Sequence, residues 1–385
     1  MASMKKIGKS YRITVELGKD TNGKRQRKYI TIKDKKIANN ILAHYNSQEK
    51  FGGFVTPNKK KFKETMEHWL YNHALFNVEF LTFVSYYEPM YKYIIPKLGD
   101  IYTQQLTVSD LEQYYAYLMN DCGLSANTVK HHHANIHKAL KIAKKNKEVI
   151  TNVADDVELP KIDEYENQVY NSEQLHTLFS LVKGKNLFIP IMIGAYTGLR
   201  RSEVVGLKWE NIDFNERIIH VKHAKIRPRK KFLTYLKPKH GELTQDGNLL
   251  KKPKNKTSYR DVPMSEILYE VLWKWRIEQK GLRVKLGDKA IYNDFVCTMR
   301  EDGREMKPDL ITQSFHNLLI KNDLPLIRFH DLRGTLATLL IENDENIKYV
   351  SELLGHYDTK TTERYYAKTV KARMQKVATK IDNVI

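Results

Sequence analysis

Side chains suited to the chemistry of a phosphodiester are spread through the C-terminal half of the chain. Guanidinium groups can hold the non-bridging oxygens of a phosphate bidentately as negative charge develops on them. A tyrosine hydroxyl, with an ordinary pKa of about 10, needs a base and positive surroundings to act as a nucleophile. A lysine or histidine can protonate the departing oxygen. The candidates are Arg200, Lys254, His330, Arg333, His356 and one of the adjacent Tyr365 and Tyr366.

This chemistry requires no metal ion, and the sequence has no convincing cluster of carboxylates. The run "HHH" at 131–133 cannot converge on one ion, because consecutive helical residues point about 100° apart. The two cysteines, Cys122 and Cys297, are far apart and show no CxxC or Cys/His spacing. They exclude a disulfide framework and indicate a reducing cytoplasm.

Basic residues are in large excess. Lys and Arg number 65 against 45 Asp and Glu, a formal net charge of +20, which is typical of a protein with a polyanionic partner. No segment reaches the roughly 18 apolar residues of a membrane-spanning helix, and the N-terminus lacks the apolar core of a signal peptide. Nucleic acid is therefore favoured over a membrane, with ribosome association or mere solubility as the alternative.

A tight bend positions the first candidate arginine. The apolar segment "FIPIMIGAY" stops at Thr197 and Gly198, and a second helical pattern begins at once. Arg200 is therefore expected in the first turn after the bend, with Glu203 one turn later, where it can point into a cleft. The same pattern also fits an ordinary surface arginine.

A helix is predicted in "IRFHDLRGTLATLLIEN". His330 and Arg333 are three residues apart, so they share a face of this helix, while Leu336, Leu339 and Leu340 are expected on its buried side. Both polar residues are then expected in the first turn, where free N–H groups and the helix dipole favour an anion.

The lysine, the second histidine and the tyrosines are less sharply defined. Lys254 ends a long basic excursion between two predicted strands, "RIIHV" and "YRDVPM", but spacing alone does not select one lysine there. His356 follows an apolar helical pattern in "VSELLGHYD". Tyr365 and Tyr366 diverge by about 100° on a helix, so only one of them can face a phosphate.

The elements that position these residues fall into three sections, as expected for 385 residues. In residues 1–55, "YRITVEL" and "RQRKYITI" read as strands joined by a turn at "DTNG", and a helix with Ile37, Ile41 and Leu42 on one face follows. Such a sheet could lie in a DNA groove, or it could be a small structural cap. Its candidate DNA contacts are Arg12, Arg25, Arg27 and Lys28.

A linker, "FGGFVTPNKKKFK", leads to an all-helical section at 62–156, with N-cap candidates at Thr107 and Ser125. Its last helix carries a basic surface that is either a solvated face or a binding surface for phosphates. The candidate DNA contacts of the linker and this helix are Lys59, Lys60, Lys61, Lys130, His132, Lys138 and Lys141.

A proline-marked linker precedes the third section, 169–385. The tail "VKARMQKVATKIDNVI" has apolar residues at helix spacing. This pattern fits a tail that docks on a neighbouring protomer, and packing on its own domain is the alternative.

The ordered motifs "TGLRRSE", "HDLR" and "LLGH", followed by a tyrosine, resemble the tyrosine recombinase (integrase) family. The resemblance implies a multidomain fold, mainly α with small β-sheets. It comprises an arm-binding domain of sheet plus helix, an all-helical core-binding domain and a mixed α+β catalytic domain of the tyrosine recombinase type. The arm-binding section is similar to that of integrases from phages and conjugative transposons, so a mobile-element integrase is expected.

The resemblance also implies roles for single residues. The family's catalytic set falls on Arg200, Lys254, His330, Arg333, His356 and Tyr365, with Glu203 in support and Lys256 as the second choice of lysine. Tyr365 is nine residues after His356, the spacing at which the family's nucleophile usually follows this histidine. Gly334 stands where the family often has histidine, and the basic excursion is longer than the family's usual hairpin.

The implied reaction is a transesterification. The tyrosine attacks a DNA phosphate, giving a 3′-phosphotyrosine bond and a free 5′-hydroxyl, and a partner strand's hydroxyl later reverses the step without ATP or another cofactor. The implied partners are double-stranded DNA at core and arm sites, a homotetramer on two DNA sites joined through the tail, and an accessory protein for excision. The expected location is the bacterial cytoplasm, with the nucleoid.

Two other functions fit part of the pattern. Type IB topoisomerases use a similar set of residues to nick and reseal one duplex, but the arm-binding section and the tail argue against that class. A DNA-binding repressor on an inactive integrase scaffold would be expected to lack at least one of the six residues, and all six are present.

Overall fold

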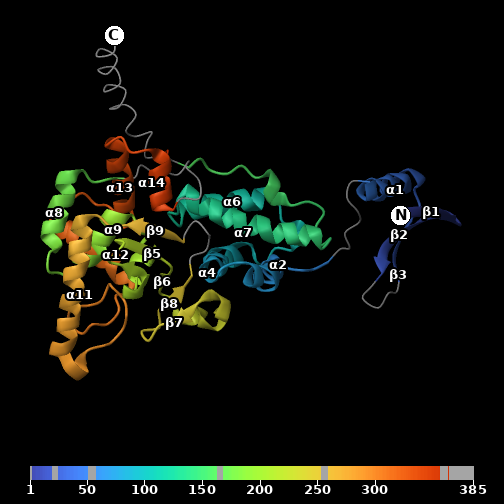
Figure 1. The fold of residues 1–385 in the computed structure, drawn as a ribbon. Coiled ribbons are helices and arrows are strands. Elements are labelled where there is room, and N and C mark those ends of the chain that lie inside the picture. The colour runs from blue at the N-terminus through green and yellow to red at the C-terminus, as the bar shows by residue number, and fades with distance from the viewer. Residues whose placement is uncertain are drawn as a thin grey trace, which may run out of the picture. The chain divides into compact units, whose positions relative to one another are not determined.

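This computed structural model describes residues 2–19, 25–50, 58–162, 168–252, 259–355 and 363. The chain divides into two compact units, Met1–Glu164 and Tyr165–Ile385, whose elements are drawn in Figure 1. The division falls within the proline-marked stretch that the sequence indicates as a linker. Mainly helical structure with small sheets, the predicted fold class, is confirmed.

An antiparallel three-stranded sheet begins the first unit, in the order β1-β2-β3. Strands β2 (Ser10–Lys19) and β3 (Arg25–Ile32) are the two predicted ones, and β1 (Ala2–Ile7) adds an edge. Helix α1 (Lys35–Lys50) packs on the sheet around buried Ile13, Val15 and Ala38. The prediction for Ile37 is wrong: its side chain is 52% exposed, because the smaller Ala38 takes the inward position.

Two helices of the first unit each contain a π-helical segment. α2 (Phe62–Trp69) and α4 (Phe80–Pro89) continue into η1 (Leu70–Ala74) and η2 (Met90–Ile94), and then into the short α3 (Leu75–Asn77) and α5 (Ile95–Leu98). A π-helical turn inserts an extra residue into the helical ladder. Before η2, Pro89 has no N–H to donate, which interrupts the regular ladder at that point.

Helices α6 (Val108–Asn120) and α7 (Ala126–Lys145) complete the helical part of the first unit. Thr107 caps α6 by accepting the Asp110 N–H at 3.2 Å, and Ser125 caps α7 by accepting the Thr128 N–H at 3.3 Å. Both predicted N-caps are therefore confirmed.

The core of the second unit is built around α9 (Phe188–Thr197), which is buried on nearly every side because almost all of its residues are apolar. Helices α11 (Glu266–Leu286) and α13 (Asp331–Glu342) pack against it (Figure 1). The surrounding elements are α8 (Ser172–Val182), α10 (Arg201–Gly206), α12 (Pro308–Lys321), α14 (Ile347–Leu354) and the antiparallel sheet β4-β5-β9 (Ile212–Asp213, Ile218–Val221, Arg260–Pro263).

The basic excursion between β5 and β9 carries a sheet of its own, in the order β6-β8-β7 (Ala224–Ile226, Leu249–Lys251, Glu242–Leu243). Lys225 is fully buried there and forms an ion pair with Glu305 at 2.7 Å. Burial lowers the pKa of Lys225, and Glu305 opposes that change. A Cβ on Gly206 would lie 2.9 Å from the backbone nitrogen of Lys225, so the backbones of α10 and β6 lie close together. Strand β6 of the excursion is thus fixed to the body of this unit.

Helix α13 is more deeply buried than the sequence indicates. Leu336, Leu339 and Leu340 were expected on the inward face, but they are only half-buried. Leu332, Ala337 and Ile341 take the deepest apolar positions instead, because α13 is covered on more than one side. Among the described residues, no helix is long and apolar enough to cross a membrane.

Candidate active site

A left-handed residue between α9 and α10 sets the position of Arg200. Gly198 ends α9 with φ +62°, and a Cβ at this residue would lie 2.3 Å from a Leu354 methyl carbon. Only glycine adopts this conformation without strain and also leaves room for the leucine. The Thr197 hydroxyl accepts the Leu199 N–H at 3.2 Å. Arg200 follows in extended conformation, immediately before α10 rather than inside its first turn.

Glu203 fixes both the backbone and the side chain of Arg200. Its carboxylate accepts the Arg200 N–H at 2.9 Å and Arg200 Nη1 at 2.8 Å. Arg200 Nη2 donates in addition to the carbonyl of Gly355 at 3.2 Å. Glu203 is buried, whereas about a third of the Arg200 side chain is exposed. The guanidinium is therefore held by Glu203 and the Gly355 carbonyl, and part of it stays exposed to solvent.

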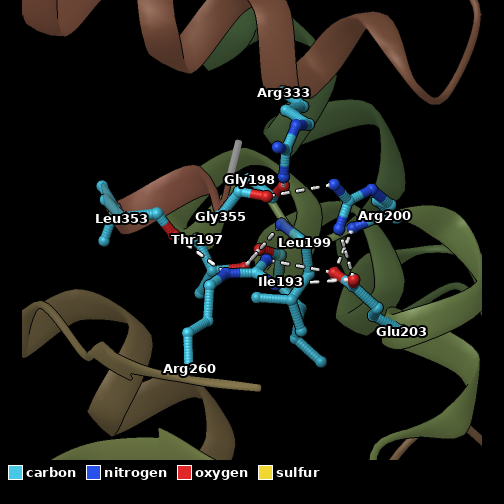
Figure 2. Close-up of polar contacts among 10 residues, drawn as sticks. All are labelled: Ile193, Thr197, Gly198, Leu199, Arg200, Glu203, Arg260, Arg333, Leu353 and Gly355. Atoms are coloured by element: carbon cyan, nitrogen blue, oxygen red, sulfur yellow. Dashed lines mark hydrogen bonds and ion pairs between the residues drawn. The ribbon is translucent and has the colours of Figure 1, made fainter. Parts of the chain in front are cut away.

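A second arginine, Arg260, reaches the same carboxylate from β9. Its Nη2 lies 3.0 Å from one Glu203 oxygen and its Nη1 lies 3.4 Å from the other. Figure 2 shows Glu203 between the guanidinium groups of Arg200 and Arg260. Burial raises the pKa of Glu203, but the charges and hydrogen bonds of Arg260 and Arg200 outweigh burial and bring the pKa below its ordinary value. Glu203 is thus a carboxylate at neutral pH.

The sequence interpretation missed Arg260, although a signal for it exists. In the predicted strand "YRDVPM", residues two apart face the same way. Arg260 therefore shares a face with Val262, which is fully buried. A cation on the inward face of a strand indicates a buried partner of opposite charge.

His330 and Arg333 lie beside Arg200. Arg333 is buried, and its Nη1 donates to the carbonyl of Gly198 at 2.8 Å. His330 immediately precedes α13 and reaches the surface. Removal of water from the ring and the charge of Arg333 lower the pKa of His330, Asp331 opposes them, and Arg328 and Arg200 contribute smaller decreases. The structure therefore brings three of the six predicted catalytic residues, together with the supporting Glu203, into one cluster, with a neutral imidazole at pH 7.

The start of α13 is braced on its other side. Asp331 is buried and accepts hydrogen bonds from the guanidinium of Arg328, at 2.7 Å from Nη2 and 3.0 Å from Nε. The Thr335 hydroxyl donates to the Asp331 carbonyl and accepts the N–H of Tyr170. These contacts hold the first turn of α13 that carries Arg333.

The remaining predicted site residues, Lys254, Lys256, His356, Tyr365 and Tyr366, lie outside the described residues. Their neighbours in the sequence are described: β8 and β9 flank the segment of Lys254, and α14 ends just before His356. Within the described ranges, no group of three or more His, Cys, Asp or Glu side chains could hold a metal ion.

The candidate DNA contacts have different environments. Arg12, Arg27, Lys28, Lys59, Lys138 and Lys141 are exposed, Lys130 is half-buried, and the side chain of Arg25 lies outside the described residues. Three of the lysines contact protein groups: Lys60 pairs with Glu148 at 2.8 Å, Lys61 with Asp100 at 2.6 Å, and Lys138 donates to the Tyr86 hydroxyl at 2.7 Å.

His132 corrects the expectation of a basic surface residue. It is 1% exposed, and its Nδ1 lies 2.7 Å from the hydroxyl of Tyr114 in the core between α6 and α7. Burial, with a smaller contribution from His131, lowers the pKa of His132 to about 4. A neutral, buried imidazole cannot contact a DNA phosphate, so His132 is a core residue.

Comparison with known proteins shows the family to which the chain belongs. Residues 168–372 match the model of the Phage integrase family. A XerC-like tyrosine recombinase of Caldanaerobacter subterraneus is 27% identical over 378 residues, covering 95% of this chain and 94% of that protein. The ICEBs1 integrase of Bacillus subtilis is 25% identical, covering 78% of each chain.

Solved structures share the fold. A Tn1549 transposon integrase in complex with a circular intermediate DNA has a TM-score of 0.67 at 21% identity, covering 83% of this chain and 99% of that chain. A lambda integrase tetramer bound to a Holliday junction has a TM-score of 0.58 at 15% identity, covering 93% of this chain and 94% of that chain.

Proposed function

Since the chain belongs to the phage integrase family, we propose that it cleaves DNA through Tyr365. It is a tyrosine recombinase that acts in site-specific recombination and integration of mobile elements. The phenolic oxygen attacks the phosphorus, and the bond from phosphorus to the 5′ oxygen breaks. The products are a 3′-phosphotyrosine bond and a free 5′-hydroxyl, and a partner strand's 5′-hydroxyl reverses the step. Because the phosphoester bond is exchanged and not hydrolysed, no ATP or other cofactor enters the reaction.

The observation that carries this proposal is the convergence of Arg200, Arg333 and His330 around the end of α9. In the proposed reaction the two guanidinium groups bind the non-bridging oxygens of the phosphate, on which charge develops. Glu203 supports by holding Arg200 in position.

Proton transfer is assigned to the other members of the set. His330, a neutral imidazole consistent with its lowered pKa, accepts the proton of the Tyr365 hydroxyl as the phenolic oxygen attacks. Lys254, with Lys256 as the second choice, protonates the departing 5′ oxygen, and His356 stabilises the phosphate from the segment after α14.

We assign the three predicted sections accordingly: an arm-type DNA-binding domain at 1–55, a helical core-binding domain at 62–156 and a catalytic domain with its tail at 169–385. The exposed cations of the first two sections contact phosphates. Double-stranded DNA is the substrate, four protomers act on two DNA sites through their C-terminal tails, and excision uses an accessory protein in the bacterial cytoplasm. The lambda integrase tetramer on a Holliday junction and the DNA-bound Tn1549 integrase support this assembly.

A nicked suicide duplex carrying the end of the element tests the proposal. The wild-type protein is expected to give a covalent protein–DNA band, because the nick lets the fragment with the 5′-hydroxyl diffuse away. Tyr365→Phe is expected to abolish the band, and its matched control Tyr366→Phe to keep it. The opposite pattern would overturn the assignment of the nucleophile, and supercoil relaxation without strand exchange would favour a topoisomerase.

A further inference from the structure

Arg260 joins two elements around the candidate site. Its Nε donates to the carbonyl of Leu353 in the last turn of α14 at 3.0 Å, while its Nη1 and Nη2 face the two oxygens of Glu203. The side chain is 7% exposed. Arg260 itself begins β9, the strand that follows the segment of Lys254 in the sequence.

These contacts use the particular shape of a guanidinium. Its donors form a rigid planar fork, so one edge can face a carboxylate while Nε points to a carbonyl in another direction. A lysine ammonium at the end of a flexible chain can replace the charge but not both directions at once. Arg260 therefore fixes Glu203 and α14 relative to each other.

The two elements that Arg260 joins also meet at Arg200. Glu203 accepts from Arg200, and Arg200 donates to the carbonyl of Gly355, two residues after the carbonyl that accepts from Arg260. Two arginines, one carboxylate and the end of α14 thus form a closed set of hydrogen bonds (Figure 2). Moving any one of its members disturbs the orientation of the Arg200 guanidinium.

Stability alone does not account for such an arrangement. Burying an arginine with a carboxylate costs both groups their hydration, and well-packed apolar residues are often as stable or more stable. A buried pair does, however, fix one geometry among several. The geometry fixed here is that of the arginine proposed to bind the phosphate.

We propose that Arg260 is a positioning residue for DNA cleavage, acting through Glu203 on Arg200 and through Leu353 on the end of α14. This inference rests on the proposed function. It assigns Arg260 no contact with DNA, so its loss slows the cleavage step and leaves DNA binding intact.

The test compares Arg260→Gln and Arg260→Lys with a matched control, Arg217→Gln. Arg217 lies in the same unit, pairs with exposed Glu266 and contacts none of the site residues that the structure describes. The rate of covalent adduct formation is measured at saturating nicked duplex under single-turnover conditions. Affinity for the same duplex is measured with each variant in a Tyr365→Phe background, where no cleavage occurs.

Arg260→Gln is expected to lower the cleavage rate by about tenfold to a hundredfold, the effect of losing a hydrogen bond to a charged group. DNA affinity should remain within about threefold of the control, since phosphate contacts elsewhere supply most of the binding. Arg260→Lys is expected to restore part of the rate. Combining Arg260→Gln with Glu203→Gln should slow cleavage little more than Glu203→Gln alone, because both act on Arg200.

A cleavage rate equal to that of Arg217→Gln would overturn the proposal, as would a fall in rate matched by an equal fall in affinity. If Arg260→Gln does not fold, Arg260→Lys decides: normal thermal unfolding with slower cleavage supports the proposal, and unchanged cleavage refutes it. Failure of the proposed function itself is distinct, because the wild-type protein would then give no covalent band.

Discussion

Arg333 donates a hydrogen bond to the carbonyl of Gly198, the left-handed residue that turns the chain from α9 into α10. An arginine on α13 thereby fixes the bend that carries Arg200, although the two arginines are far apart in the sequence. The side chain that is proposed to bind one oxygen of the phosphate also positions the group that is proposed to bind another.

The bend at Gly198 makes a first prediction possible. Gly198→Ala should lower the free energy of unfolding by about 2 kcal/mol or more, because the alanine must adopt a left-handed conformation and its Cβ would overlap Leu354. Gly184→Ala is a matched control, because Gly184 also has a positive φ but has open space around its Cβ position. Urea unfolding should show a loss of only about 1 kcal/mol for the control. Equal losses would contradict the role of the close contact.

The buried carboxylate at Glu203 gives a second prediction. Glu203→Ala leaves Arg260 buried and Arg200 without its partner, so the free energy of unfolding should fall by about 3–5 kcal/mol. Glu266→Ala, which removes the exposed partner of Arg217, should change it by less than about 1 kcal/mol. Similar values for the two variants in denaturant titrations would show that Glu203 is not held as described.

The ion pair of the excursion, Lys225 with Glu305, gives a third. Lys225→Met leaves a buried, uncompensated carboxylate and should cost about 3–5 kcal/mol of unfolding free energy. The double variant Lys225→Met with Glu305→Met should recover most of that loss, since two packed apolar side chains replace the pair. Thermal unfolding of the three variants measures the recovery, and strictly additive losses would argue against coupling between the two residues.

The core histidine His132 predicts how stability depends on pH. Its pKa is about 4 in the folded protein, against 6.5 as its ordinary value. Between these values the unfolded chain binds a proton that the folded chain does not, so stability is full above pH 6.5 and falls as the pH is lowered toward 4. The contribution is about 3 kcal/mol at 1.36 kcal/mol per pKa unit.

Comparison with His132→Gln isolates this effect. The variant has no titrating group at this position, while its amide oxygen can still accept a hydrogen bond from Tyr114. Urea midpoints at pH 7 and pH 4.5 should therefore differ less for the variant than for the wild type. An equal decrease in both proteins would show that other groups cause the loss at low pH.

Apolar patterns predicted several elements. The strands β2, β3, β5 and β9 each bury one face, while the wholly apolar segment of α9 is buried on nearly every side, and in both cases burial determines where the element packs. The edge strand β1 and the small sheet β6-β8-β7 were not predicted. Their segments carry many lysines, which obscure an apolar pattern. β1 forms a hairpin with β2, the next strand in the sequence, whereas β6 pairs with the distant β8, which local pattern does not encode.

The candidate site was predicted in part for similar reasons. Ordered motifs identified Arg200, His330 and Arg333, which the fold brings together from the starts of α10 and α13. Those motifs do not include Arg260, whose partner Glu203 is distant in the sequence. The prediction for His132 was wrong in the opposite direction, since a surface contact was expected and the residue lies in the core. A histidine among lysines resembles part of a basic surface, but the face of α7 that carries His132 packs into the core.

The ends of the basic excursion meet across the sheet. Val221 pairs with Arg260 at the end of the ladder between β5 and β9, so the chain leaves and re-enters the domain at one point. Extra residues in the exposed turn between β7 and β8, at 245–247, would cost little loop-closure entropy and would leave β5, β9 and the buried Lys225–Glu305 pair in place. The length of this turn is therefore independent of the position of Arg260, the residue at the exit of the excursion that contacts Glu203.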